Sequence, residues 1–133
     1  MKTFTTPVFI ALIALLSLQL GCSEKKDVPQ VMCTEEYRTV SLKIIGDTLT
    51  DFYTVRELTG ETIQYNANGF KPFMNYYPVL EDSYQPVLVN SSERFTFKGF
   101  IGEELVVEVK YLIGAVFCHI YKLNGKDEVT ISK

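Results

Sequence analysis

The chain has a single histidine, His119, which directly follows Cys118. A thiol beside an imidazole is the combination that cysteine-dependent enzymes use as nucleophile and general base. Neighbouring residues of a β-strand point to opposite faces, however, so a Cys118–His119 dyad cannot form in a regular strand. A lone histidine also argues against a histidine-based metal site. We therefore expect His119 to lie at the surface or rim, in contact with Thr130, and we expect no metal ligands.

Neighbouring acidic residues include the pairs Glu35-Glu36, Glu81-Asp82 and Glu103-Glu104. Two facing carboxylates can act as general acid and base, as in glycosidases, so a catalytic pair is one interpretation. The spacing singles out no pair, and a solvated loop or strand end accounts for each. The chain also lacks a phosphate-binding glycine loop and a nucleophile elbow. We therefore expect no catalytic residue, no cofactor and no enzymatic activity.

Cys22 indicates a different chemistry, because an apolar run ends there and a charged run begins. Residues 8–18 are almost entirely apolar and follow Lys2. This run is shorter than the roughly 20 apolar residues that a membrane span needs, and it is typical of an export signal. The sequence Leu20-Gly21-Cys22 resembles the lipobox of bacterial lipoproteins, although Gln19 stands where an apolar residue is usual.

The resemblance to lipoproteins implies that residues 1–21 are a cleaved signal peptide and that Cys22 is lipidated. Residues 22–31 would then be a lipidated tether, since several acyl chains together hold a protein stably at a membrane. Glu24 and Asp27 loosely fit the acidic signal of surface-exposed lipoproteins. We expect an outer membrane lipoprotein of the cell envelope, with surface exposure left open. The alternative is an ordinary secretory signal followed by a chance cysteine.

Two cysteines, Cys33 and Cys118, remain in the mature chain once Cys22 is assigned to lipid. An even number of cysteines in an exported protein favours a disulfide, because the compartment is oxidising. We predict that Cys33 and Cys118 pair. The alternative is two buried free thiols.

The mature chain alternates apolar and polar residues with period two in several segments, which predicts strands with one face in a core. The clearest segments are 38–44, 94–98 and 104–111. No segment shows convincing helical spacing, apart from one turn of helix at residues 85–88. Short strands separated by turn residues predict an all-β fold. We expect residues 32–133 to form a single antiparallel β-sandwich of about seven strands.

Two turns are predicted from local residue types. Asn124-Gly125 lies between alternating runs and is the strongest short hairpin signal. A two-residue turn there would pair Cys118 with Ile131 and would turn Cys118 towards the core, where a buried disulfide would lie. A second hairpin is expected at Thr59-Gly60.

Short motifs occur at residues 33–42, 52–56, 59–61, 76–84 and 118–126. They resemble those of a family of small lipoproteins of Bacteroides-like bacteria for which no activity is established. The resemblance implies a secreted β-domain. The start of the mature chain is also distantly similar to transthyretin-like repeats, but Ile44-Ile45-Gly46-Asp47 lacks their Gly-x-Pro turn. The sandwich is thus expected to be immunoglobulin-like or transthyretin-like.

Residues 69–78 concentrate aromatic side chains between turn-forming residues. Connections that contain Gly and Pro usually run over the surface, and exposed aromatic residues there can stack on sugars or anchor a protein partner. The alternative is that they cap the core, since a small domain needs most of its apolar residues for burial. The candidate binding residues are Phe70, Phe73, Tyr76 and Tyr77.

The charge of the chain narrows the classes of partner. The formal net charge is −3, and there is no basic run in the mature part, which argues against nucleic acid. The expected function is therefore a lipid-anchored, non-enzymatic binding module for an envelope protein or a glycan. The alternative is a structural accessory subunit of a surface fibre or uptake assembly.

Overall fold

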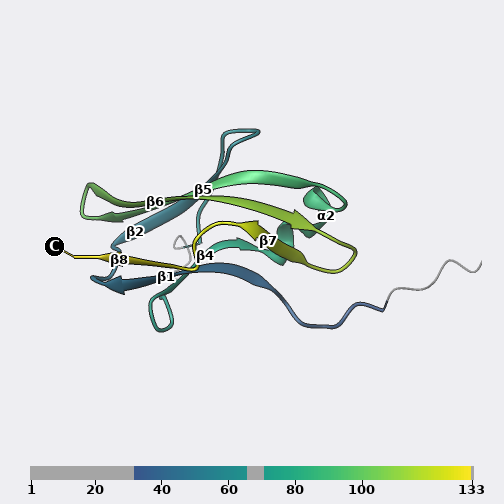
Figure 1. Cartoon of the computed structure of the whole chain (residues 1–133), viewed down its shortest axis with the longest axis horizontal. Coiled ribbons are helices and arrows are strands. Elements are labelled where there is room, and N and C mark those ends of the chain that lie inside the picture. Colours follow the sequence, from purple (N-terminus) through teal and green to yellow (C-terminus); the bar gives the residue numbers. More distant parts are fainter. Residues whose placement is uncertain (1–31, 66–70, 133) are drawn as a thin grey trace, which may run out of the picture. The chain divides into compact units, whose positions relative to one another are not determined.

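Two β-sheets stack face to face in the computed structural model, which describes residues 32–65 and 71–132 (Figure 1). The predicted all-β sandwich is confirmed. Residues Val31–Lys133 form one compact unit. The predicted signal peptide, the predicted tether with Cys22, and Phe70 lie outside the described residues.

The elements are β1 (Thr39–Gly46), β2 (Asp51–Arg56), β3 (Glu61–Ile63), β4 (Tyr76–Glu81), the 3-10 turn η3 (Asp82–Tyr84), α2 (Gln85–Leu88), β5 (Ser92–Ile101), β6 (Glu104–Ala115), β7 (Ile120–Asn124) and β8 (Glu128–Ile131).

The larger sheet has five strands in the order β3-β2-β5-β6-β7. Its centre is the long hairpin β5–β6, whose register runs from Ser92 opposite Gly114 to Ile101 opposite Glu104. Alternation along both strands turns one face inward, as the sequence predicts. Phe95 and Phe97 are fully buried there, because that face meets the other sheet.

The smaller sheet has three strands in the order β4-β1-β8. Strand β1 pairs antiparallel with β4, from Thr39 opposite Glu81 to Lys43 opposite Tyr76. It pairs parallel with β8, and that pairing begins only at Lys43. The sandwich is therefore not purely antiparallel, and the N-terminal half of β1 has no partner from β8.

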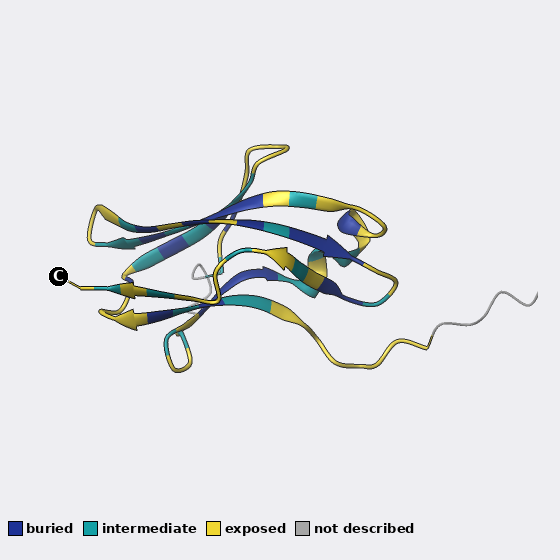
Figure 2. Ribbon diagram, viewed as in Figure 1, coloured by how far each residue is buried: buried dark blue, intermediate teal, exposed yellow. Residues whose placement is uncertain are grey.

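The core lies between the two sheets, and Figure 2 shows its residues in dark blue on the strands while most turns are exposed. An edge-to-face contact joins the sheets, since the ring centroids of Phe52 on β2 and Tyr77 on β4 lie 5.1 Å apart. Aromatic pairs in this geometry contribute more than their buried area alone. The fully buried side chains of the core include Leu42, Tyr77, Val79, Leu80, Phe95, Phe97 and Ile113.

The prediction of a hairpin at Asn124-Gly125 is wrong. Strand β7 pairs with β6 in the larger sheet, whereas β8 pairs with β1 in the smaller one. The connection between them crosses from one sheet to the other beside Tyr111. Gly125 has a φ of 128°, and a Cβ there would lie 2.2 Å from Tyr111 Cδ1. The turn signal correctly identified a position that requires glycine. The two flanking strands do not pair with each other, however, because β7 pairs with β6 and β8 pairs with β1.

Two other local predictions are confirmed. Strands β2 and β3 form the hairpin predicted around Thr59-Gly60, with Thr54 opposite Ile63. Residues Gln85–Leu88 form the single predicted helical turn. Leu88 is fully buried in it, so this short helix closes one end of the core.

Candidate functional site

The tip of the chain leading into β4 is a two-residue turn that presents apolar side chains. Phe73 and Tyr76 pair across the turn, and the Tyr76 N–H donates to the Phe73 carbonyl at 3.0 Å. Met74 and Asn75 both have positive φ, 51° and 60°. Two consecutive positive φ values are the signature of the tight turn that suits a β-hairpin. We call Phe73, Met74, Asn75 and Tyr76 the hairpin tip.

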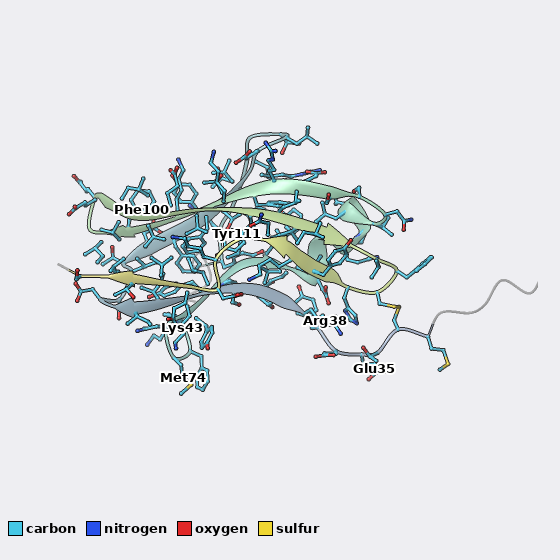
Figure 3. All side chains as sticks on the ribbon, in the orientation of Figure 1. Glu35, Arg38, Lys43, Met74, Phe100 and Tyr111 are labelled. Atoms are coloured by element: carbon cyan, nitrogen blue, oxygen red, sulfur yellow. A yellow bond between two sulfur atoms is a disulfide. The ribbon has the colours of Figure 1, made fainter. Side chains whose placement is uncertain are left out.

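The hairpin tip is exposed and its backbone is strained at Met74. Phe73 is 78% exposed and Met74 is 71% exposed, and Tyr76 is also exposed. In Figure 3, Met74 lies at the end of a loop that projects away from the sandwich. A positive φ is uncommon for methionine, which lacks the local hydrogen bonds that help asparagine to adopt it. Such strain concentrates at binding and catalytic sites.

The four aromatic residues proposed as binding candidates divide into separate groups. Phe73 and Tyr76 are exposed at the hairpin tip. The prediction for Tyr77 is wrong, because Tyr77 is fully buried and its hydroxyl oxygen accepts a hydrogen bond from the Leu49 N–H at 3.0 Å. Strand alternation explains the difference, since adjacent tyrosines in β4 point to opposite faces. Burial also raises the pKa of the Tyr77 hydroxyl.

His119 is not the rim residue predicted from the sequence. It is buried, and its Nδ1 lies 2.7 Å from Asp82 Oδ2. Its Nε2 lies 3.1 Å from Thr34 Oγ1. With Asp82 ionised, the Nδ1–H of the ring donates to the carboxylate, and the Thr34 hydroxyl, which can both donate and accept, is the partner of Nε2. We call Asp82, His119 and Thr34 the Asp82 node.

Asp82 also accepts hydrogen bonds from two backbone N–H groups. The Ile120 N–H donates to Oδ1 at 2.8 Å, and the Arg38 N–H donates to Oδ2 at 2.7 Å. Burial alone would raise the pKa of Asp82, but these two bonds and the His119 ring outweigh it and lower the pKa below its ordinary value. The carboxylate thus joins three segments, at the start of the sandwich, in η3 and at the start of β7.

The order hydroxyl, imidazole, carboxylate is also that of hydrolytic triads. In this chain Asp82 also accepts bonds from the Ile120 and Arg38 N–H groups, so it holds three segments together in addition to orienting the ring. The neighbouring groove described below is lined by other residues, and neither Thr34 nor His119 is among them. Sequence reasoning missed the node because its members stand 37 and 85 residues apart along the chain.

The predicted disulfide between Cys33 and Cys118 is confirmed, and Figure 3 shows it as a yellow bond. It joins residues 85 apart with a Cα–Cα distance of 5.3 Å. The prediction that it is buried in the core is wrong, because Cys33 is exposed and Cys118 is half-buried. Cys118 lies in the turn before β7, where the Val116 N–H donates to the His119 carbonyl.

A groove of about 570 Å³ lies between the N-terminal half of β1 and β7. The Lys43 N–H donates to the Asp127 carbonyl. Backbone groups two residues apart in a strand point the same way, so the backbone N–H and C=O of Ser41 face the groove. The Ile120 N–H points away from β6 to Asp82, so the backbone of Lys122 faces the groove as well. Its lining residues are Glu36, Tyr37, Arg38, Thr39, Val40, Ser41, Ile120, Tyr121, Lys122 and Asp127.

Comparison of the chain with protein-family models, curated proteins and solved structures finds no match. The resemblance to envelope lipoproteins therefore stays a prediction. No helix within residues 32–65 and 71–132 has the length and hydropathy to cross a membrane. Across the same described residues, no three His, Cys, Asp or Glu side chains are grouped to hold a metal ion.

Proposed function

We propose that this chain is a lipid-anchored, non-enzymatic binding module of the bacterial cell envelope, and that the hairpin tip binds a protein partner or a glycan. The observation that carries the proposal is a strained two-residue turn with Phe73, Met74 and Tyr76 exposed around it. An apolar tip costs solvation free energy in the unbound chain, because its side chains stay in water. A partner that covers it would recover that cost.

The hairpin tip has the properties of a small binding hot spot. Binding free energy concentrates in a few aromatic anchors that a partner surrounds and desolvates. Phe73 and Tyr76 stand directly opposite each other, at a spacing that lets two rings act together. The turn is also held from behind, since the Ile44 N–H donates to the Asn75 carbonyl at 2.9 Å. A tip held in this way loses little conformational freedom on binding.

Substitution of both Phe73 and Tyr76 by alanine is expected to weaken partner binding while leaving the fold intact. We expect a loss of about 2 kcal/mol or more in binding free energy, roughly 30-fold in Kd, as for truncated aromatic anchors. Exposed positions of this kind change the free energy of unfolding by about 0.5 kcal/mol or less. The measurement is gentle membrane extraction of the tagged full-length protein, followed by identification of co-purifying proteins and a glycan-binding screen.

The matched control is Leu58→Ala, since Leu58 is similarly exposed on the β2–β3 turn. It removes exposed apolar surface elsewhere and is expected to retain the partner. Equal retention by the Phe73→Ala/Tyr76→Ala variant and by the control would contradict a role for the hairpin tip. A fall in its unfolding midpoint well below that of the control would show instead that the two aromatic residues stabilise the fold.

The anchor is tested separately through Cys22. Replacement of Cys22 by serine is expected to move the protein from the membrane fraction to the soluble envelope fraction, because the thiol that carries the lipid is lost. The measurement is cell fractionation with labelled palmitate. A Cys22→Ser variant that still sediments with membranes and still carries label would contradict the lipid anchor.

The groove between β1 and β7 favours a second candidate, a structural subunit that assembles by strand addition. The backbone groups of Ser41 and Lys122 that face it are the kind with which an extended segment pairs at a sheet edge. The same extraction distinguishes the two candidates. A partner retained by the Phe73→Ala/Tyr76→Ala variant but lost from Ser41→Arg, which fills the groove, would favour strand addition.

A further inference from the structure

Four exposed apolar residues gather at the end of the sandwich where the described chain begins. They come from separate segments: Met32 at the start, Val87 in α2, and Val116 and Phe117 in the β6–β7 turn. Phe117 is 67% exposed. Covalent and polar contacts hold these segments together, since the disulfide ties Cys33 to Cys118 and the Gln85 side-chain amide donates to the Val116 and Phe117 carbonyls at 2.9 Å.

This end also carries no charged residues over two long stretches. Residues 83–92 and 112–118 contain no Asp, Glu, Lys or Arg, although 22% of the whole chain is charged. The two stretches meet where Ser92 pairs with Gly114 and where Val89 bridges Ala115. The other end of the same hairpin carries Glu103 in its turn and Glu104 at the start of β6. We call Met32, Val87, Val116 and Phe117, with residues 83–92 and 112–118, the uncharged end.

The position of the predicted lipid anchor at Cys22 indicates which end of the sandwich would face the membrane. Cys22 precedes Met32 by about ten residues, which span at most roughly 35 Å when fully extended. Figure 1 shows the start of the described chain, α2 and the β6–β7 turn at one end of the sandwich, with the C terminus at the opposite end. The chain therefore enters the sandwich at the uncharged end (Figure 1), which is the end that a lipid on Cys22 would tether.

We propose that the uncharged end rests on the lipid surface, with Phe117 and Val116 in the interface between headgroups and acyl chains. The proposal deepens the proposed function and rests on its lipid anchor. Apolar side chains that enter this interface leave water, and residues 83–92 and 112–118 carry no charged side chain that would be desolvated with them, while the exposed Glu35 and Glu36 lie on the segment that leads from Met32 towards β1. The anchor supplies a high effective concentration of membrane, so a weak second contact is enough to orient the domain.

The chain contains no tryptophan, so a single introduced indole reports on its own surroundings. The test uses the chain from Cys22 onward, which contains the whole compact unit. With Cys33 and Cys118 oxidised, Cys22 is its one free thiol and couples to a maleimide-headgroup lipid in phosphatidylethanolamine–phosphatidylglycerol vesicles. Phe117→Trp is compared with Phe73→Trp, which places the same indole at the exposed hairpin tip.

We expect the indole fluorescence of the Phe117→Trp variant to shift to the blue and to lose intensity when the vesicles contain bromolipids. The Phe73→Trp variant should show neither change. Equal quenching of the two variants, whether both are quenched or neither is, would overturn the proposal. A blue shift of the Phe117→Trp variant without bromolipid quenching would also overturn it, because it would indicate a protein–protein contact. Unfolding midpoints equal to wild type establish that both variants keep the fold.

The design separates this inference from the anchor on which it rests. Chemical coupling supplies the lipid whether or not cells attach one, so the quenching result depends only on the uncharged end. Labelled palmitate on Cys22 in cells, with no quenching of the Phe117→Trp variant on vesicles, would leave the anchor and overturn the membrane contact. Failure of Cys22 to take up lipid in cells would overturn the anchor, and with it the natural orientation that the contact implies.

Discussion

Replacement of Asp82 by alanine is expected to lower the free energy of unfolding by about 2–4 kcal/mol, because several partly buried hydrogen-bond donors lose their shared acceptor. The Asp82 side chain is 9% exposed, and its loss leaves the Ile120 and Arg38 N–H groups and His119 Nδ1 without their acceptor. Domains of this size are stable by about 5–15 kcal/mol, so the effect is large. Chemical denaturation monitored by circular dichroism measures it.

The neighbouring acid provides the control for this substitution. Glu81 accepts only a long hydrogen bond of 3.3 Å from the Tyr37 hydroxyl. Glu81→Ala is therefore expected to cost about 1 kcal/mol or less. Equal destabilisation by Asp82→Ala and Glu81→Ala would contradict a fastening role for the Asp82 node.

The Asp82 node also predicts a pH dependence of stability. Because the pKa of Asp82 is lowered in the folded chain, the unfolded chain binds the proton more tightly. The stabilisation from Asp82 is then complete above the ordinary carboxyl pKa of 3.8 and is lost as the pH falls below it, through the folded value. Asp82→Asn should flatten this part of the stability profile. Glu93, whose pKa is lowered by Arg56, contributes a similar slope that the variant keeps.

The strands were predictable because each buries one face. A period-two pattern follows directly from burial against a single partner layer, as the alternation around Phe95 and Phe97 illustrates. The pattern says which residues share a face, but it leaves open which face turns inward. This explains the error at Tyr77: the two adjacent tyrosines have equal apolar character, and only the position of the second sheet decides that Tyr77 enters the core while Tyr76 stays in water.

The error at Asn124-Gly125 has a different origin. A turn signal is local, whereas strand pairing is decided by which edges are open when the sheets assemble. Tyr111 packs against Gly125, and its hydroxyl donates to the Lys126 carbonyl at 2.8 Å, so the glycine serves a crossover rather than a hairpin. Lys122 and Asp127 still form the ion pair that a hairpin would have placed opposite each other. Local contacts of this kind do not distinguish the two topologies.

The Asp82 node could not have been predicted from residue types. Thr34, Asp82 and His119 belong to three segments that meet only in the folded chain, and no spacing along the sequence links them to one another. The hairpin tip was partly predictable, because the aromatic cluster is visible in the sequence. What the structure adds is the strained turn at Met74, which brings the exposed Phe73 and Tyr76 opposite each other, and the strand alternation that buries Tyr77.

Removal of the disulfide by the double substitution Cys33→Ser/Cys118→Ser is expected to lower the free energy of unfolding by up to about 4–5 kcal/mol. The bridge closes a loop between residues 85 apart, and the chain-entropy model assigns that much to the restriction of the unfolded chain. Denaturant unfolding of the oxidised, reduced and double-serine proteins measures it. The reduced wild type should match the double-serine variant.

Cys22→Ser is the matched control, since it removes a thiol that takes no part in the bridge, and its unfolding midpoint should equal that of wild type. A change below about 1 kcal/mol in the double-serine variant would contradict a large entropic contribution. The bridge and the Asp82 node hold the same segment, because Cys33 is followed directly by Thr34. Combining Asp82→Ala with the two serine substitutions should therefore give a non-additive change of about 0.5–3 kcal/mol, as for residues that share one network. Strictly additive changes in the free energy of unfolding would mean that the disulfide and the Asp82 node stabilise the sandwich independently. They would contradict the inference that both hold the segment of Cys33 and Thr34 as one unit.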